Sequence, residues 1–167
     1  MQRLRLKLEA EWFVFLSEDQ QLLVKTAISL FEFVETSGQE FFDYSFIVFP
    51  MAKAYEGFLK RYLNRVGLIS QEVYESNRFR IGRALNPDLN HNHRDEHWYY
   101  DDIESVCGKE IGREMWETWL TCRNQVFHYF PNKNHFLSQE QARQYLIKMM
   151  DSMDHLINCK EMHDRSS

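Results

Sequence analysis

The chain has 167 residues and a formal net charge of −5, and apolar residues make up 44% of it. Only 3 Pro and 6 Gly stand against 13 Phe and 4 Trp, which excludes a disordered or loop-rich protein and suits one domain with a substantial core. A sequence pI of about 5.8 argues against the broad basic surface of a general nucleic-acid binder. Any RNA contact would therefore need locally concentrated positive charge.

Residues 1–16 are predicted to form an N-terminal arm. Leu4, Leu6 and Leu8 alternate with charged residues, a period of two that indicates a short strand or an extended arm, although the first turns of a charged helix fit equally well. A lone strand would need a pairing partner, such as a second copy of the chain. The first ten residues lack the apolar core of a signal peptide, and no apolar run reaches membrane-spanning length, so we expect neither feature.

Two long helices are predicted in the first half of the chain. Ser17 begins a capping-box pattern with acidic residues in the first turn, and the helix that it opens ends at the Ser37-Gly38 pair. The second helix starts near residue 40 or 46 and ends at Val66, before a glycine cap. Pro50 requires either that this helix begin just before it or that it kink there.

The second half adds short helices and two further long ones. The short helices are expected at 70–76, 78–85 and 98–107. A long helix is predicted at 110–130, stopped by Pro131, and a last one from Ser138, which opens another capping box, to about Asn158. Residues 161–167 are expected to form a frayed tail. The expected fold is an all-α, up-and-down bundle of four long helices in one domain, residues 17–160.

Three histidines fall in the longest polar stretch, residues 86–97: His91, His93 and His97. Their spacing could bind zinc or a similar ion. No cysteine or capped scaffold fixes their geometry, however, so we favour a flexible loop at the mouth of a site over a metal centre.

The three cysteines, Cys107, Cys122 and Cys159, show no CxxC pattern. Their odd number, with two of them on predicted apolar faces, indicates reduced thiols and a cytoplasmic protein.

The 110–130 helix contains one residue that its periodicity does not explain. Arg123 falls within the apolar arc, among Trp and Phe side chains, and a guanidinium cannot lose its proton there. It either extends past the core to water or lines a polar notch together with His128. On the same helix, Asn124 and His128 are spaced i, i+4 and are expected on the polar flank.

The residues Arg123-Asn124-Gln125-Val126-Phe127-His128 resemble the R-N-x-x-x-H motif of the HEPN superfamily, and residues 50–63, PMAKAYEGFLKRYL, resemble the helix that precedes it. Glu56 stands where HEPN toxins of the ribonuclease LS type carry an acidic active-site residue. The resemblance covers roughly residues 17–160 and implies a HEPN-like helical bundle.

The resemblance also implies an activity: metal-independent cleavage of RNA, without a cofactor, at a site where the motifs of two subunits face each other. The products would carry a 2′,3′-cyclic phosphate and a 5′-OH. His128 would be the general acid or base, Arg123 the phosphate clamp and Asn124 a supporting donor. Glu56 would orient Arg123 or His128, or assist the proton transfer.

Glu56 has a simpler interpretation as a solvated carboxylate in an i, i+4 pair with Lys60. Lys53 and Lys60, on either side of it, are weaker candidates for RNA contacts. A buried Arg123 would be tolerated only with a carboxylate or phosphate within reach, and Glu56 is the candidate for that carboxylate.

One departure from the family bears on its biological setting. HEPN toxins controlled by a nucleotidyltransferase carry Tyr two residues after the motif His, where this chain has Phe130 beside Tyr129. The ribonuclease LS type is therefore favoured, in which a protein antitoxin binds and blocks the site, in a toxin–antitoxin or phage-defence system. Those toxins have further N-terminal domains, so the chain would be a stand-alone relative or a catalytic-domain fragment.

Two other functions are compatible with the residues. One is a non-catalytic HEPN module that binds nucleotide, RNA or a partner protein, which the acidic net charge favours. The other is an unrelated helical interaction domain, in which Arg123 and His128 would lie apart on the surface.

Overall fold

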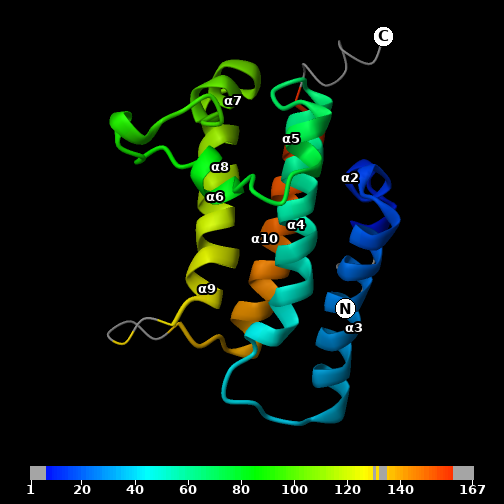
Figure 1. Ribbon diagram of the computed structural model, residues 1–167. Coiled ribbons are helices and arrows are strands. Elements are labelled where there is room, and N and C mark those ends of the chain that lie inside the picture. The colour runs from blue at the N-terminus through cyan, green and yellow to red at the C-terminus, as the bar shows by residue number, and fades with distance from the viewer. Residues whose placement is uncertain (1–6, 130, 132–134, 160–167) are drawn as a thin grey trace.

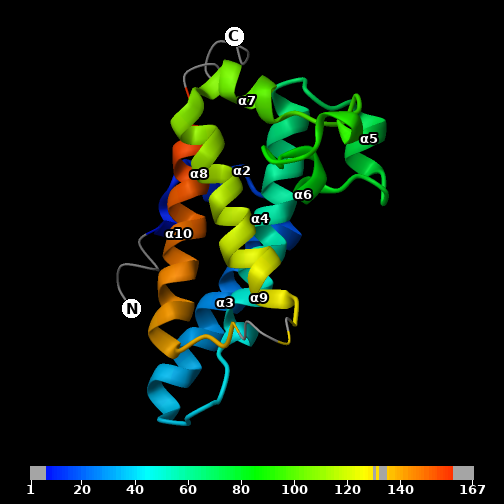
Figure 2. The ribbon, with the colours of Figure 1, turned by 90° about the vertical axis from the view of Figure 1, so that its left-hand side faces the viewer.

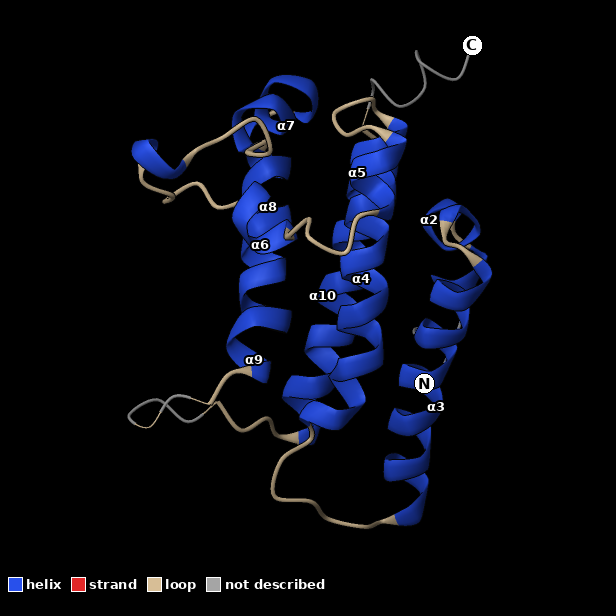
Figure 3. Ribbon diagram, viewed as in Figure 1, coloured by secondary structure: helices blue, strands red, loops and turns tan. Residues whose placement is uncertain are grey.

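The computed structural model describes residues 7–129, 131 and 135–159, and in these ranges it contains helices and no strand (Figures 1 and 3). The predicted all-α fold class is confirmed. Four long helical units alternate in direction: α3 (Glu18–Ser37), α4 (Ser45–Arg65), α8 (Lys109–Trp119) with its continuation, and α10 (Gln139–Ile157). This is the up-and-down arrangement expected from the sequence.

Helix α4 occupies the centre of the bundle, in contact with α3, α8 and α10 (Figures 1 and 2). Its buried side chains recur at helical spacing, and the largest are fully enclosed: Met51, Tyr55, Phe58, Leu59 and Tyr62. The helix begins at Ser45 and passes through Pro50. One face of α4 thus forms the core, and the opposite edge remains available for other contacts.

A buried hydroxyl pair joins α4 to α10. The Tyr55 hydroxyl lies 2.8 Å from Ser152 Oγ and donates to the Met115 carbonyl at 3.3 Å. Burial raises the pKa of Tyr55 far above its ordinary value. The polar groups of this core contact are therefore matched to each other and stay neutral.

The prediction of an arm over residues 1–16 is wrong for the part that the structure describes. Residues 7–16 form η1 (Lys7–Glu9) and α2 (Glu11–Phe15), and Trp12 is fully buried. The reason is that Trp12, Phe13 and Leu16 follow a helical spacing and enter the core, whereas the leucine alternation ends at Leu8. Residues 1–6 of the predicted arm and the tail at 161–167 lie outside the described residues.

In the connection between α4 and α8, the last short helix lies at the top of α8, whereas the first lies beside α4 (Figures 1 and 2). This connection contains short helices close to those predicted: α5 (Gln71–Glu75), α6 (Ile81–Ala84) and α7 (Tyr100–Cys107). The polar stretch that was expected to be a loop includes one further turn, η2 (His91–His93). No helix in the described part of the chain is both long and apolar enough to cross a membrane.

The expectation of three reduced cysteines is also wrong. Cys107, at the end of α7, and Cys159, just after α10, form a disulfide across 52 positions of sequence. Antiparallel packing brings these two helix ends together, which their spacing along the chain does not reveal. The disulfide removes the cysteine-based argument for a reducing compartment. Cys122 remains a free thiol in the core, and burial raises its pKa to about 12.

Thiol titration tests this assignment. Denatured, unreduced protein should expose one reactive thiol, Cys122, and reduction should raise the count to three. In the native protein Cys122 should resist alkylation, because burial keeps it protonated. Three reactive thiols in the denatured, unreduced protein would contradict the disulfide.

Candidate functional site

A cleft of about 530 Å³ opens between α4 and the lower part of the α8 unit. Its walls are formed by Phe49, Ala52, Lys53, Glu56 and Lys60 of α4 and, opposite them, by Arg123, Phe127 and His128. Every predicted site residue except Asn124 therefore borders a single cleft. Helix packing brings together two segments, residues 50–63 and 123–128, that lie far apart in the sequence.

The contact at the centre of the cleft is the expected ion pair between Arg123 and Glu56. Arg123 Nε donates to Glu56 Oε2 at 3.2 Å, and the two side chains are 34% and 28% exposed. The guanidinium also lies 5.6 Å from the centroid of the Trp119 ring. The carboxylate and the ring hold one edge of the guanidinium, and its Nη groups carry four further N–H donors.

The predicted helix over 110–130 continues to Phe127, but its second half is not a regular α-helix. After α8 the chain forms a π-helical segment, η3 (Leu120–Asn124), and then α9 (Gln125–Phe127), which ends before Pro131. Hydrogen bonds in a π turn close from i to i+5, so the residues after it rotate away from the positions that a regular α-helix would give them. Such π segments are frequent at functional sites.

His128 consequently lies off the helix. It caps α9 in an extended conformation, with φ −111° and ψ 131°, and its side chain is exposed. The expected i, i+4 stacking of Asn124 and His128 on one helical flank is therefore wrong. Asn124 is half-buried within η3 and is not among the residues that line the cleft. Phe130, which stands where some HEPN toxins carry a Tyr two residues after the motif His, lies outside the described residues.

The Trp119 ring lies close to the Arg123 guanidinium, and α6 packs against Trp119. Trp116 and Trp119 stack with ring centroids 5.5 Å apart and an interplanar angle of 16°. Gly82 of α6 faces the end of this stack: a Cβ at that position would lie 2.1 Å from Trp119 Cη2. The absence of a side chain at Gly82 therefore permits α6 to pack against Trp119. The sequence offered only a glycine inside a short helix as a sign of this contact.

A second cleft, of about 300 Å³, adjoins the first and shares Phe127 and His128 with it. Its other lining residues are Asp43, Ser45, Val126, Tyr129, His135 and Phe136. Asp43 Oδ1 accepts hydrogen bonds from the backbone N–H groups of Ser45 and Leu137, which fixes the start of α4 against the loop before α10. His128 thus borders both clefts. Sequence reasoning missed Phe49, Ala52 and Phe127 as lining residues, because apolar residues at helical spacing indicate core.

The histidine loop is held by arginine contacts. Arg94 donates to the carbonyl oxygens of Leu89 and Pro87, and its guanidinium lies 3.9 Å from the centroid of the Trp98 ring. Within the described residues, which include all three histidines of this loop, no three His, Cys, Asp or Glu side chains form a group that could hold a metal ion. His97 instead contacts Phe79 edge-on and borders a small basic cleft beside α6.

No protein-family model, no curated protein and no solved structure matches this chain.

The contact between α6 and Trp119 can be tested with Gly82→Ala. The added methyl should displace the packed Trp119 ring and lower the free energy of unfolding by about 1–3 kcal/mol, the usual cost of overpacking. Urea unfolding measures the change. Gly112→Ala is the matched control: its Cβ would lie 3.1 Å from the flexible Glu104 Cγ and 3.8 Å from the Glu104 Cα and N, and alanine favours the helix interior. Equal stabilities for the two variants would contradict the packing described.

Proposed function

We propose that this protein is a metal-independent endoribonuclease that acts at the cleft between α4 and α9. The observation that carries the proposal is that a guanidinium, an imidazole and a carboxylate, those of Arg123, His128 and Glu56, line one cleft. The first and third are joined by an ion pair. The sequence resemblance to the HEPN motif and to the helix that precedes it points to the same three residues.

The chemistry requires few groups, because RNA carries its own nucleophile. The 2′-oxygen forms a bond to the adjacent phosphorus as the bond from phosphorus to the 5′-oxygen breaks. One group accepts the 2′-OH proton, and another donates a proton to the leaving 5′-oxygen. Imidazole titrates near neutral pH and suits either transfer, which gives His128 its role. The free Nη donors of Arg123 suit the non-bridging phosphate oxygens, on which negative charge builds up.

Glu56 acts through Arg123. Its bond to Nε fixes the plane of the guanidinium and leaves the Nη edge for substrate. Asn124, half-buried in the π segment, has no contact with the cleft that would support a direct role.

We further propose that the active form is a homodimer. One chain supplies a single histidine to the Arg123 cleft, whereas the reaction requires two proton transfers; the His128 of a second copy would supply the other. Exposed aromatic residues at this end of the molecule support such a contact: Phe42, Phe46, Phe49, Tyr129 and Phe136. Phe42 is 82% exposed, and its ring packs 4.6 Å from that of Phe136. An apolar patch of this kind indicates a protein interface.

The family resemblance places such nucleases among toxins of toxin–antitoxin or phage-defence systems, and the proposal extends to that role. A protein antitoxin would then have to cover the cleft that holds Arg123 and His128.

Cleavage of RNA in the presence of EDTA tests the activity. Wild-type protein should produce 2′,3′-cyclic phosphate and 5′-OH ends, and both Arg123→Ala and His128→Ala should lose activity by at least about 100-fold, the usual scale for removing an acid or base. His128→Ala should change the free energy of unfolding by no more than about 1 kcal/mol, because the side chain is exposed.

The control for this assay is His155→Ala. His155 is also an exposed histidine, paired with Glu114 on the α8–α10 face, and its loss should leave cleavage unchanged. Saturable RNA binding without turnover by any variant would select the non-catalytic HEPN module instead. Cleavage that survives His128→Ala would refute the role given to this residue.

The homodimer is tested by a charge in the aromatic patch. Phe42→Asp should convert the dimer to a monomer in light scattering and abolish RNA cleavage, because Phe42 belongs to the exposed aromatic patch and lines neither cleft. Leu22→Asp is the control. Leu22 is 60% exposed on α3, which lies across α4 from the α8 unit (Figure 1). A monomeric wild-type protein that cleaves RNA at full rate would rule out the shared site.

A further inference from the structure

We propose that a basic face beside the candidate site binds the phosphodiester backbone of the RNA strand that extends from the cleft. The basic face comprises Lys53 and Lys60 of α4 with Arg78, Arg80 and Arg83 of the segment that leads into α6. The inference rests on the proposed function for the identity of the ligand, but it assigns a binding role to residues outside the HEPN motif.

The segment before α6 forms a small cleft of its own. It has a volume of about 110 Å³ and is lined by Arg78, Phe79, Arg80, Arg83, Ala84, Asp95 and His97. Arg78 and Arg80 are exposed, whereas Phe79, between them, is 6% exposed and anchors the segment in the core. The alternation R-F-R therefore directs two arginines to the surface on either side of one buried ring.

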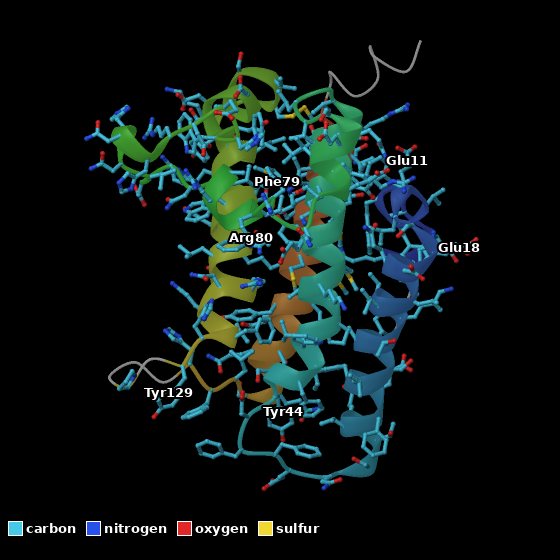
Figure 4. All side chains as sticks on the ribbon, viewed as in Figure 1. Glu11, Glu18, Tyr44, Phe79, Arg80 and Tyr129 are labelled. Atoms are coloured by element: carbon cyan, nitrogen blue, oxygen red, sulfur yellow. A yellow bond between two sulfur atoms is a disulfide. The ribbon has the colours of Figure 1, made fainter. Side chains whose placement is uncertain are left out.

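Phe79 also connects this small cleft to the candidate site. Lys60, which lines the larger cleft, places Nζ 5.9 Å from the centroid of the Phe79 ring. Figure 4 shows Phe79 and Arg80 in front of the interval between α4 and α8, the two helical units between which the candidate site opens. Gly82, two residues after Arg80, is the position at which α6 packs against Trp119. The arginines are thus fixed to the same framework that supports Arg123.

The charge of the two clefts is opposite to that of the whole chain. Acidic residues outnumber basic ones in the sequence, 25 Asp and Glu against 20 Lys and Arg. The linings of the two clefts nevertheless contain Lys53, Lys60, Arg78, Arg80, Arg83 and Arg123 against Glu56 and Asp95. A local excess of positive charge on an acidic protein attracts a polyanion to one place and repels it elsewhere.

The pairing of these residues identifies the ones that face a ligand. Arg83 is held by Asp95, with Nη2 to Oδ2 at 2.7 Å, and Arg123 is held by Glu56. Arg80 donates to the Asn77 carbonyl, which positions its guanidinium without neutralising its charge. Arg78 and Arg80, together with the two lysines of α4, therefore supply the positive charge of the face. Phosphate oxygens match the planar donor pattern of arginine.

A nucleic-acid strand fits this arrangement better than an acidic protein, because the basic face continues from the cleft where the phosphodiester would be cleaved. Contacts to phosphates position a strand without selecting its sequence. The expected ligand is therefore single-stranded RNA of any sequence, held on one side of the scissile bond.

The test compares Arg78→Glu/Arg80→Glu with Lys25→Glu/Lys109→Glu, which makes the same change in net charge at exposed lysines of α3 and α8. Fluorescence anisotropy measures the binding of a 2′-O-methyl RNA 12-mer, which lacks the nucleophile. The arginine variant should bind at least about tenfold more weakly, with a salt slope smaller by about 1 to 2, as expected for lost phosphate contacts. The lysine control should stay within about twofold of wild type. Equal melting temperatures for all three proteins establish that the fold is intact.

Cleavage assays separate this inference from the proposed function. The arginine variant should cleave a long RNA more slowly at subsaturating concentration but cleave a dinucleotide at the wild-type rate, because a dinucleotide occupies only the cleft. If wild type and arginine variant bind the 12-mer with equal affinity and salt slope, the basic face has no such role, although the nuclease proposal stands. If the wild type neither binds nor cleaves RNA, both are overturned. An acidic protein that binds wild type but not the variant, in the absence of RNA binding, would assign the face to a protein partner.

Discussion

The need to accommodate a permanent positive charge on an apolar helical surface organises this end of the molecule. Arg123 cannot be neutralised, so the fold must supply a counter-charge, and it does so from α4 through Glu56. The resulting pair joins two helices and defines the opposite walls of one cleft. The supports of Arg123 continue outward, because Trp119 lies against the guanidinium and Gly82 permits α6 to pack against Trp119. These contacts fix the orientation of the Arg123 guanidinium as well as compensating its charge.

Helix α4 serves two purposes because its two faces obey the same period. Residues that include Met51, Tyr55 and Phe58 form the core, and on the other edge Lys53, Glu56 and Lys60 recur at steps of three and four to give one polar stripe. That stripe supplies the carboxylate of the ion pair and the two lysines of the basic face. The positive charge that RNA binding would require is therefore local, as an acidic chain demands.

Periodicity and capping predicted the helical bundle well, since Ser17 and Ser138 both form the capping boxes that their sequences indicate. The Arg123–Glu56 contact was expected because the family resemblance singled out Glu56 and because a half-buried guanidinium needs a counter-charge. Other features of the structure could not be predicted from the sequence. A π segment leaves no periodic sign, so His128 was placed on a helix that ends one residue earlier. The Cys107–Cys159 disulfide and the Gly82 contact depend on how distant elements meet, and the burial of Trp12 was obscured by the leucine alternation before it.

The central claim is that Arg123 and His128 contact the same phosphodiester group of the RNA. The most direct test is an NMR titration of the wild-type protein with a 2′-O-methyl RNA strand that cannot be cleaved, observing the Arg123 Nε–H and the His128 ring resonances. The account predicts that both shift together and saturate at the same RNA concentration, and that a 2′-O-methyl dinucleotide suffices to move both. It would be contradicted if the RNA bound while the Arg123 and His128 signals stayed unchanged.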